Sequence, residues 1–203
     1  MIGVDFDNTI VCYDDVFGRV AVEQALVPPE AATSKTAVRD HLRATGREAL
    51  WTELQGTVYG PRMMDARLFP GVGRFFAACR ARGLAVAIVS HRTRFPYLGP
   101  RHDLHAAARD FLARHGFHDA DGIALPPDRV FLEETKEAKL RRIAQLGCTS
   151  FIDDLPEVLD DPLFPPGVRR VLFDPGTLHR PPAGIGAAAS WEDLERLLTG
   201  GAA

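Results

Sequence analysis

The stretch that decides the fold is Ile2-Gly3-Val4-Asp5-Phe6-Asp7-Asn8-Thr9, close to the start of the chain. It begins as a continuous apolar run, which is typical of a strand covered on both faces in a parallel sheet. Asp5 and Asp7 follow at once, and their side chains point to the same side if the strand continues. Ligands of open parallel sheets bind at the carboxyl ends of the strands, where we expect these two carboxylates to lie.

Four further apolar runs predict buried strands, and helical patterns separate them. With the first strand at residues 2–6, the predicted strands are 84–89, 129–132, 149–152 and 168–173. The predicted helices are 72–82, 104–115, 134–146 and one that begins after Ser190, a plausible N-cap. Strands that alternate with helices predict an α/β fold with a mostly parallel sheet.

Residues 13–68 break this alternation, because they contain helical patterns but no convincing strand. We therefore predict two domains: an α/β core of residues 1–12 and 69–203, and a small helical insertion of residues 13–68. The segments 162–166 and 181–186 are rich in Pro and Gly and are interpreted as loops. The last four residues, 200–203, are expected to form a frayed tail.

Composition narrows the class of protein. The 203 residues are 46% hydrophobic and 25% charged, which is typical of a globular chain, and the formal net charge of −3 argues against a nucleic-acid partner. No apolar run approaches the length of a membrane span. The three cysteines are widely spaced, which favours neither a disulfide framework nor a zinc ribbon. We expect a cytoplasmic protein without a membrane or nucleic-acid partner, and the sequence gives no indication of its oligomeric state.

A second group of acids follows the run 149–152. Asp153 and Asp154 come directly after it, and Glu157 lies three residues further on. Each acidic strand end alone could be a turn or a helix N-cap. Carboxylates that converge at one sheet edge repel one another, however, and a divalent cation with oxygen ligands relieves that repulsion. The two acidic strand ends together therefore predict a Mg²⁺ site.

Two more polar groups could bind a phosphate. Ser90 follows the run 84–89, and a hydroxyl beside exposed backbone N–H groups suits a phosphate oxygen, although a simple cap or turn is the alternative. Lys136 begins a predicted helix, where its ammonium could neutralise a phosphoryl group and an aspartate together. Lys139 is the competing candidate. We favour Lys136 because it lies at the start of the helix, nearer the expected site.

The chain resembles the haloacid dehalogenase superfamily in four pieces that occur in the same order. They are the motif Asp5-Phe6-Asp7-Asn8-Thr9, then Ser90, then Lys136, and last the acids at 153–157. The resemblance extends over essentially the whole chain. It implies a Rossmann-like sheet of strand order 5-4-1-2-3 between layers of helices. It also implies that residues 13–68 form a helical cap of the C1 type.

The resemblance further implies roles for these residues. Asp5 would be the nucleophile that forms an aspartyl-phosphate, and Asp7 the acid and then the base. Mg²⁺ would be held by Asp5, the Asp7 main-chain carbonyl and Asp153, with support from Asp154 or Glu157. The residues expected to contact the phosphoryl group or the adjoining loop are Ser90, Lys136, Asn8 and Thr9. His91 and Arg92 directly follow Ser90, and on that ground we expect them to contact the substrate.

The predicted function is Mg²⁺-dependent hydrolysis of a phosphate monoester, with a small phosphorylated metabolite as substrate. Dehalogenases of the superfamily use a single aspartate and no metal, so the second acid, Asp7, argues against that chemistry. A phosphomutase remains an alternative, as does a phosphonate hydrolase, for which Lys35 is the only lysine of the insertion. A binding protein of the same fold without catalytic activity is a further alternative.

Overall fold

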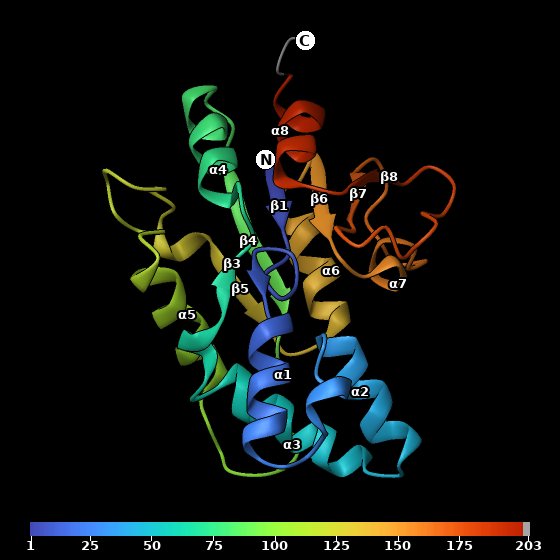
Figure 1. The fold of residues 1–203 in the computed structure, drawn as a ribbon. Helices are drawn as coiled ribbons and strands as arrows, with labels where there is room; N and C mark the ends of the chain where they lie inside the picture. The colour runs from blue at the N-terminus through green and yellow to red at the C-terminus, as the bar shows by residue number, and fades with distance from the viewer. Residues whose placement is uncertain (201–203) are drawn as a thin grey trace. The chain divides into compact units, whose positions relative to one another are not determined.

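Six parallel strands form the main sheet, in the order β5-β4-β1-β6-β7-β8 (Figure 1). The computed structural model describes residues 1–200, so most of the predicted tail, residues 201–203, lies outside the described residues. The five predicted strands, numbered 1 to 5 along the chain, are all present as β1, β4, β5, β6 and β7. Their order in the sheet is the predicted 5-4-1-2-3, read from the opposite edge. Their bounds are β1 Ile2–Val4, β4 Val86–His91, β5 Val130–Glu133, β6 Ser150–Asp153 and β7 Arg169–Phe173.

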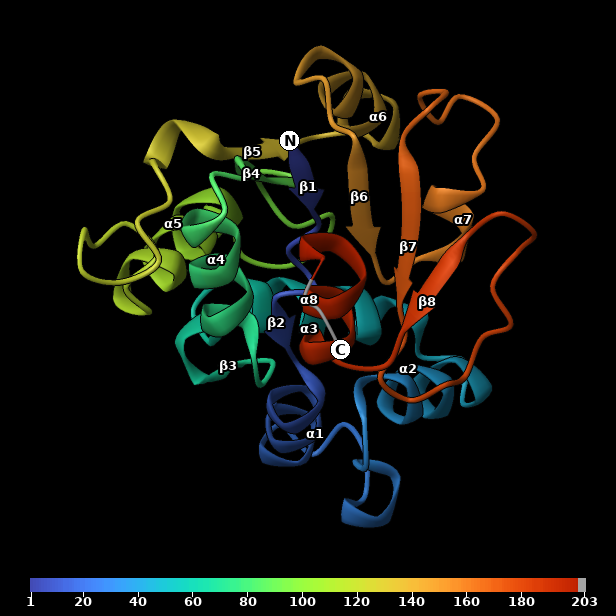
Figure 2. The same ribbon diagram turned by 90° about the horizontal axis from the view of Figure 1, so that it is seen from above.

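The sixth strand, β8 (Gly186–Ala188), begins in a segment that the sequence interpretation treated as a loop. It lies beside β7 (Figure 2), with Val171 opposite Gly186 and Phe173 opposite Ala188. Backbone pairing holds this strand, and its Gly-Ala-Ala sequence has none of the large apolar side chains that indicate a strand. The hydrophobic pattern therefore could not reveal it.

Helices cover both faces of the sheet, as the continuous apolar strands predict. On one face, α6 (Lys136–Gln145) and α7 (Pro156–Leu159) contribute to a core cluster that includes Leu172 of β7. The next residue, Phe173, points to the other face and packs against Trp191 of α8 (Trp191–Thr199), with the ring centroids 5.8 Å apart. Helix α4 (Val72–Ala81) packs against α8 on that face.

Polar side chains cap the starts of several helices, among them α8 and α6. The Ser190 hydroxyl accepts a hydrogen bond from the Asp193 amide at 3.1 Å, which confirms the predicted N-cap of α8. Thr135 caps α6 in the same way through the Ala138 amide, also at 3.1 Å. Within residues 1–200, no helix combines the length and the apolarity needed to cross a bilayer.

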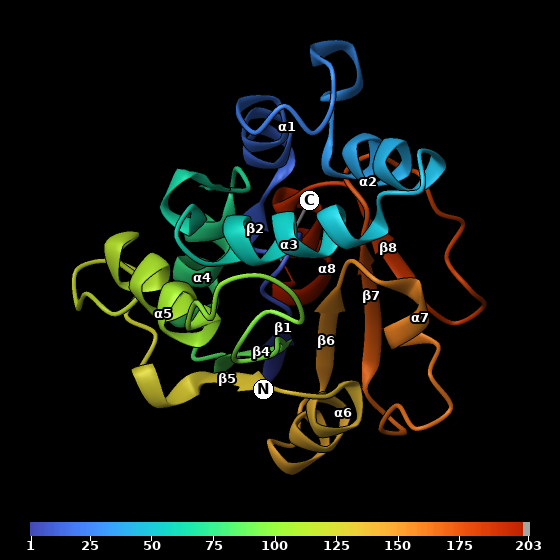
Figure 3. The same cartoon turned by 90° about the horizontal axis from the view of Figure 1, so that it is seen from below.

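The chain divides into two compact units. The first contains Met1–Ile10, Leu68–Arg92 and the chain from Gly116 onward, and the second contains Val11–Arg67 and Thr93–His115. The helices of the second unit include α1 (Asp14–Glu23), α2 (Lys35–Ala44), α3 (Glu48–Tyr59) and α5 (Leu104–Arg114), seen in Figure 3. Short 3-10 turns lie at Pro29–Ala31, Met63–Asp65 and Pro127–Arg129, and β2 (Val11–Cys12) pairs with β3 (Arg67–Leu68).

The second unit has an aromatic core of its own. The Phe17 ring lies 5.1 Å from that of Trp51 and 5.6 Å from that of Tyr59, and the Tyr13 ring lies 5.0 Å from that of Tyr59. The ammonium of Lys35 lies 5.6–5.9 Å from the Tyr13, Phe17 and Tyr59 rings, within the range of cation–π attraction.

The second unit is larger than the insertion predicted at residues 13–68, because it also contains Thr93–His115. Glycines of α3 and of its C-terminal end permit the close approach of this segment. A Cβ atom at Gly56 would lie 2.8 Å from the Cβ of Pro96, and one at Gly60 would lie 2.7 Å from the Cβ of His102. Helix periodicity alone does not reveal which unit a helix joins, so the sequence interpretation left α5 in the core.

Candidate active site

Asp5 lies immediately after β1, at the carboxyl end of the sheet. Its amide donates to the carbonyl of Ile152 in β6 at 2.9 Å, so the pairing of these neighbouring strands continues for one residue beyond β1. In the same register Asp5 lies opposite Asp153, the last residue of β6, so the two side chains are neighbours on one face of the sheet. Asp5 is only 4% exposed and Asp153 is fully buried.

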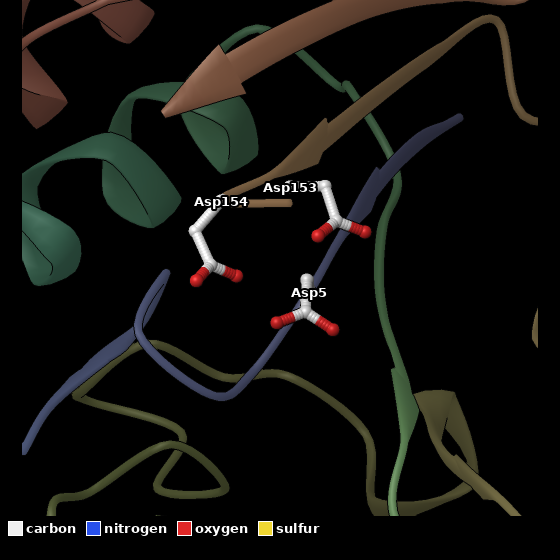
Figure 4. A group of neighbouring side chains, drawn as sticks. All are labelled: Asp5, Asp153 and Asp154. Carbon is white, nitrogen blue, oxygen red and sulfur yellow. The ribbon is translucent and has the colours of Figure 1, made fainter. Parts of the chain in front are cut away.

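Three carboxylates converge at this edge, from Asp5, Asp153 and Asp154 (Figure 4). Each offers one oxygen, and these oxygens all lie within 4.8 Å of one another. Carboxylate oxygens at such separations fit a hard divalent cation such as Mg²⁺. Between the two supporting acids that the sequence left open, the structure brings Asp154 into this group, whereas Glu157 lies exposed in the first turn of α7.

The lysine at this site is Lys139, which corrects the preference for Lys136. The Lys139 ammonium nitrogen lies 2.6 Å from an oxygen of Asp5 and 2.6 Å from an oxygen of Asp153. Lys136 lies instead 2.5 Å from Asp161, with 43% of its side chain exposed. Helical side chains tilt toward the N-terminus of the helix, so a long side chain one turn inside reaches back to its start.

Burial and charge set the protonation of this cluster. Burial raises the pKa of Asp5 to about 7; Lys139 counteracts that shift, and the charges of Asp153 and Asp7 add to it. Burial alone would lower the pKa of Lys139, but the carboxylates of Asp153 and Asp5 outweigh it and raise the pKa of this ammonium. With every group ionised, the three carboxylates and the ammonium sum to −3 + 1 = −2, which a divalent cation would neutralise.

Asp7 has a buried basic neighbour. One of its carboxylate oxygens lies 2.5 Å from a guanidinium nitrogen of Arg92, whose side chain is 2% exposed. The sequence interpretation assigned Arg92 to substrate contact because it follows Ser90, and spacing alone gave no signal of this ion pair. His91, the last residue of β4, is exposed, and its pKa is lowered by partial burial and by the charge of Lys139.

Two buried hydroxyls at this sheet edge lack a hydrogen-bond partner among the described residues, those of Ser90 and Thr9. Both residues are at most 1% exposed. A buried hydroxyl without a partner is energetically unfavourable. Ser90 is the second-to-last residue of β4, and its hydroxyl could form the missing hydrogen bond with an oxygen of a bound ligand.

The loop between Asp5 and Thr9 is a tight turn. Asn8 has a φ of +56°, in the left-handed region that Asn tolerates better than most residues. The Ile10 amide donates to the carbonyl of Phe6 at 3.0 Å, and the Trp191 indole N–H donates to the carbonyl of Thr9 at 3.1 Å. These bonds hold the segment that carries Asp7.

No protein-family model matches the sequence, and no curated protein matches it either. Solved structures do resemble the fold. A predicted phosphoglycolate phosphatase from Haemophilus somnus 129PT shares 15% identity, with 97% of this chain and 96% of that chain covered and a TM-score of 0.59. A HAD family hydrolase from Deinococcus radiodurans R1, with bound phosphate and sodium, shares 14% identity over 98% and 94% of the two chains, with a TM-score of 0.58.

A dehalogenase also resembles the chain, with 15% identity over 98% of this chain and 96% of that chain and a TM-score of 0.57. These structures include both phosphatases and dehalogenases, and their sequence identity to this chain is low. They therefore establish the fold but do not identify the reaction, which has to be inferred from the residues of the site. The chain has the fold of haloacid dehalogenase-like hydrolases.

Proposed function

We propose that the chain is a Mg²⁺-dependent phosphate monoester hydrolase with Asp5 as the nucleophile. The observation that carries the proposal is that the Asp5 carboxylate contacts the ammonium of Lys139 and converges with the carboxylates of Asp153 and Asp154. Lys139 takes the role first assigned to Lys136. The ammonium and the unpartnered hydroxyl of Ser90 are suited to hold phosphoryl oxygens.

In the proposed first step, an Asp5 carboxylate oxygen attacks phosphorus. The bond from phosphorus to the leaving oxygen breaks, its electron pair remains on that oxygen, and Asp7 supplies the proton. In the second step, a water molecule attacks the phosphorus of the aspartyl-phosphate and gives a proton to Asp7. The bond to Asp5 then breaks, phosphate departs and the Asp5 carboxylate is restored.

Mg²⁺ would supply positive charge beside the phosphoryl oxygens when it is bound. Asp5, Asp153 and Asp154 are the side chains that would hold it, and the main-chain carbonyl of Asp7 remains the proposed fourth protein ligand. We propose a small phosphorylated metabolite as the substrate. Asn8 and His91 remain proposed contacts of the phosphoryl group or the substrate.

The second acid favours phosphate ester hydrolysis over dehalogenation. Asp7 lies two residues after the nucleophile and is held by Arg92, so an acid–base group is available for a leaving alcohol. Dehalogenases of the superfamily have a single aspartate at this motif, because the halide that leaves in their reaction needs no proton. This difference is the reason to propose a phosphatase.

The proposal is tested by measuring phosphate release from a panel of phosphate monoesters, with Mg²⁺ and with EDTA. We expect release that requires the metal and is abolished in Asp5→Asn, while the exposed Asp128→Asn variant retains it. Product analysis separates the alternatives, because a mutase releases no free phosphate and a phosphonate hydrolase breaks a C–P bond. Absence of turnover with every ester would contradict the proposal and favour a binding role.

A further inference from the structure

A buried arginine holds the proposed acid–base residue. The guanidinium of Arg92 lies 2.5 Å from Oδ1 of Asp7, and only 2% of the Arg92 side chain is exposed, against 17% for Asp7. The two residues are 85 positions apart in the sequence. An ion pair that joins two strand ends so closely restricts the orientation of both side chains.

The main chain and a ring fix the position of Arg92. Its amide donates to the carbonyl of Glu133 in β5 at 2.8 Å, directly after the pairing of β4 with β5 ends. Its guanidinium carbon lies 5.7 Å from the ring centroid of Phe6, the residue that precedes Asp7 in the chain. Arg92 is therefore anchored to β5 and reaches across to the loop that follows β1.

We propose that Arg92 is a positioning residue that acts through Asp7. By binding Oδ1, it fixes the plane of the Asp7 carboxylate and so the direction in which this group passes a proton to the leaving oxygen. This inference rests on the proposed phosphatase function and assigns Arg92 a role different from the substrate contact expected from the sequence. It follows from the contact geometry, since a displaced acid loses much of its effect on the rate.

The leaving group provides a readout that a merely structural role would not change. An alkyl phosphate needs a proton on its leaving oxygen, whereas p-nitrophenyl phosphate releases a stabilised anion and needs it far less. A misplaced Asp7 therefore slows alkyl esters more than aryl esters. General loss of structure, in contrast, would slow both substrates by the same factor.

The experiment compares kcat and KM of Arg92→Met, Arg92→Lys and Asp7→Asn with both classes of ester. For Arg92→Met, we expect kcat to fall about 100-fold with an alkyl ester and less than about tenfold with p-nitrophenyl phosphate, with KM little changed. Arg92→Lys keeps the charge and should recover part of the loss. Arg94→Met is the matched control, because Arg94 is an exposed arginine paired with Asp103, and it should behave as the unmodified protein.

A double variant completes the test. If Arg92 acts through Asp7, adding Arg92→Met to Asp7→Asn should lower kcat by less than about twofold. Equal losses with both esters, a faster alkyl reaction, or additive losses in the double variant would overturn the inference. If Arg92→Met does not fold, as judged by circular dichroism, Arg92→Lys supplies the same comparison. An unmodified protein without activity on either ester would refute the phosphatase proposal instead.

Discussion

The ammonium of Lys139 lies 2.6 Å from a carboxylate oxygen of Asp5, although 134 residues separate them in the sequence. It lies equally close to Asp153, so one buried cation links the ends of β1 and β6. Two buried carboxylates side by side would repel each other, and the cation between them offsets that repulsion. The same contact places a positive charge where we propose that a phosphoryl group binds.

Replacing Lys139 should affect both stability and activity. Lys139→Met leaves the buried carboxylates of Asp5 and Asp153 without their cation, and breaking a buried pair in this way costs about 3–5 kcal/mol. Loss of a charge that stabilises the transition state should lower kcat about 10²–10³-fold. Urea unfolding and phosphate-release assays measure the two effects.

Lys136→Met is the comparison for that variant. Lys136 is partly exposed and paired with Asp161, so we expect a change in the free energy of unfolding below about 1 kcal/mol. Activity should remain within about fivefold of the unmodified protein, the factor that corresponds to about 1 kcal/mol. Equal losses in the two variants would contradict the assignment of Lys139.

Metal binding should stabilise the folded protein through Asp154. A ligand that binds only the folded state stabilises it by about 2.7 kcal/mol at a concentration 100 times its Kd, so saturating Mg²⁺ should raise the melting temperature. Asp154→Asn removes one of the three converging carboxylates and should reduce that rise. Glu157→Gln, at an exposed position outside the group, should leave it unchanged. The opposite pattern would assign the metal to Glu157.

The metal-free protein should lose stability as the pH rises toward neutrality. Burial raises the pKa of Asp5 from 3.8 to about 7, so between these values the folded chain holds a proton that the unfolded chain has released. The contribution of this group to the free energy of unfolding is therefore complete below the lower pKa and is lost as the pH passes the higher one.

Urea unfolding in EDTA at about pH 5 and about pH 8 tests this expectation. Asp5→Asn has no group that titrates at this position, so its stability should fall less over that interval than the stability of the unmodified protein. The difference between the two slopes isolates Asp5 from the other titrating groups. Identical slopes would show that burial does not shift the Asp5 carboxyl in this direction.

Much of the sheet could be predicted from the sequence, because buried parallel strands have continuous apolar runs. The five runs correspond to β1, β4, β5, β6 and β7, and the acids that follow β1 and β6 meet as their strand ends predict. Strand β8 could not be predicted, since backbone pairing to β7 holds a Gly-Ala-Ala segment with little apolar area.

The site contacts were less accessible to sequence reasoning. Position at the start of a helix favoured Lys136, but the direction in which helical side chains tilt brings Lys139 to Asp5, and that rule could have identified it. The pair between Arg92 and Asp7 depends on how two loops pack after different strands, and no spacing rule encodes it. A sequence pattern thus identified which strand ends bring acidic side chains together, while tertiary packing decides which side chains touch.

Trp191 should support the site from the opposite end of the chain. Its indole N–H donates to the carbonyl of Thr9 at 3.1 Å, and both residues are buried. Trp191→Phe keeps an aromatic ring against Phe75 and Phe173 but leaves that carbonyl without its donor, which should cost about 1–3 kcal/mol of stability. Because the same bond restrains the loop that carries Asp7, kcat should also fall, by up to about 100-fold if Asp7 shifts by 1 Å.

Phe76→Leu is the control, because it changes the same aromatic cluster at a residue without a bond to the loop. It should lower stability but not kcat at a temperature where both variants are folded. A normal kcat in Trp191→Phe would separate this bond from catalysis.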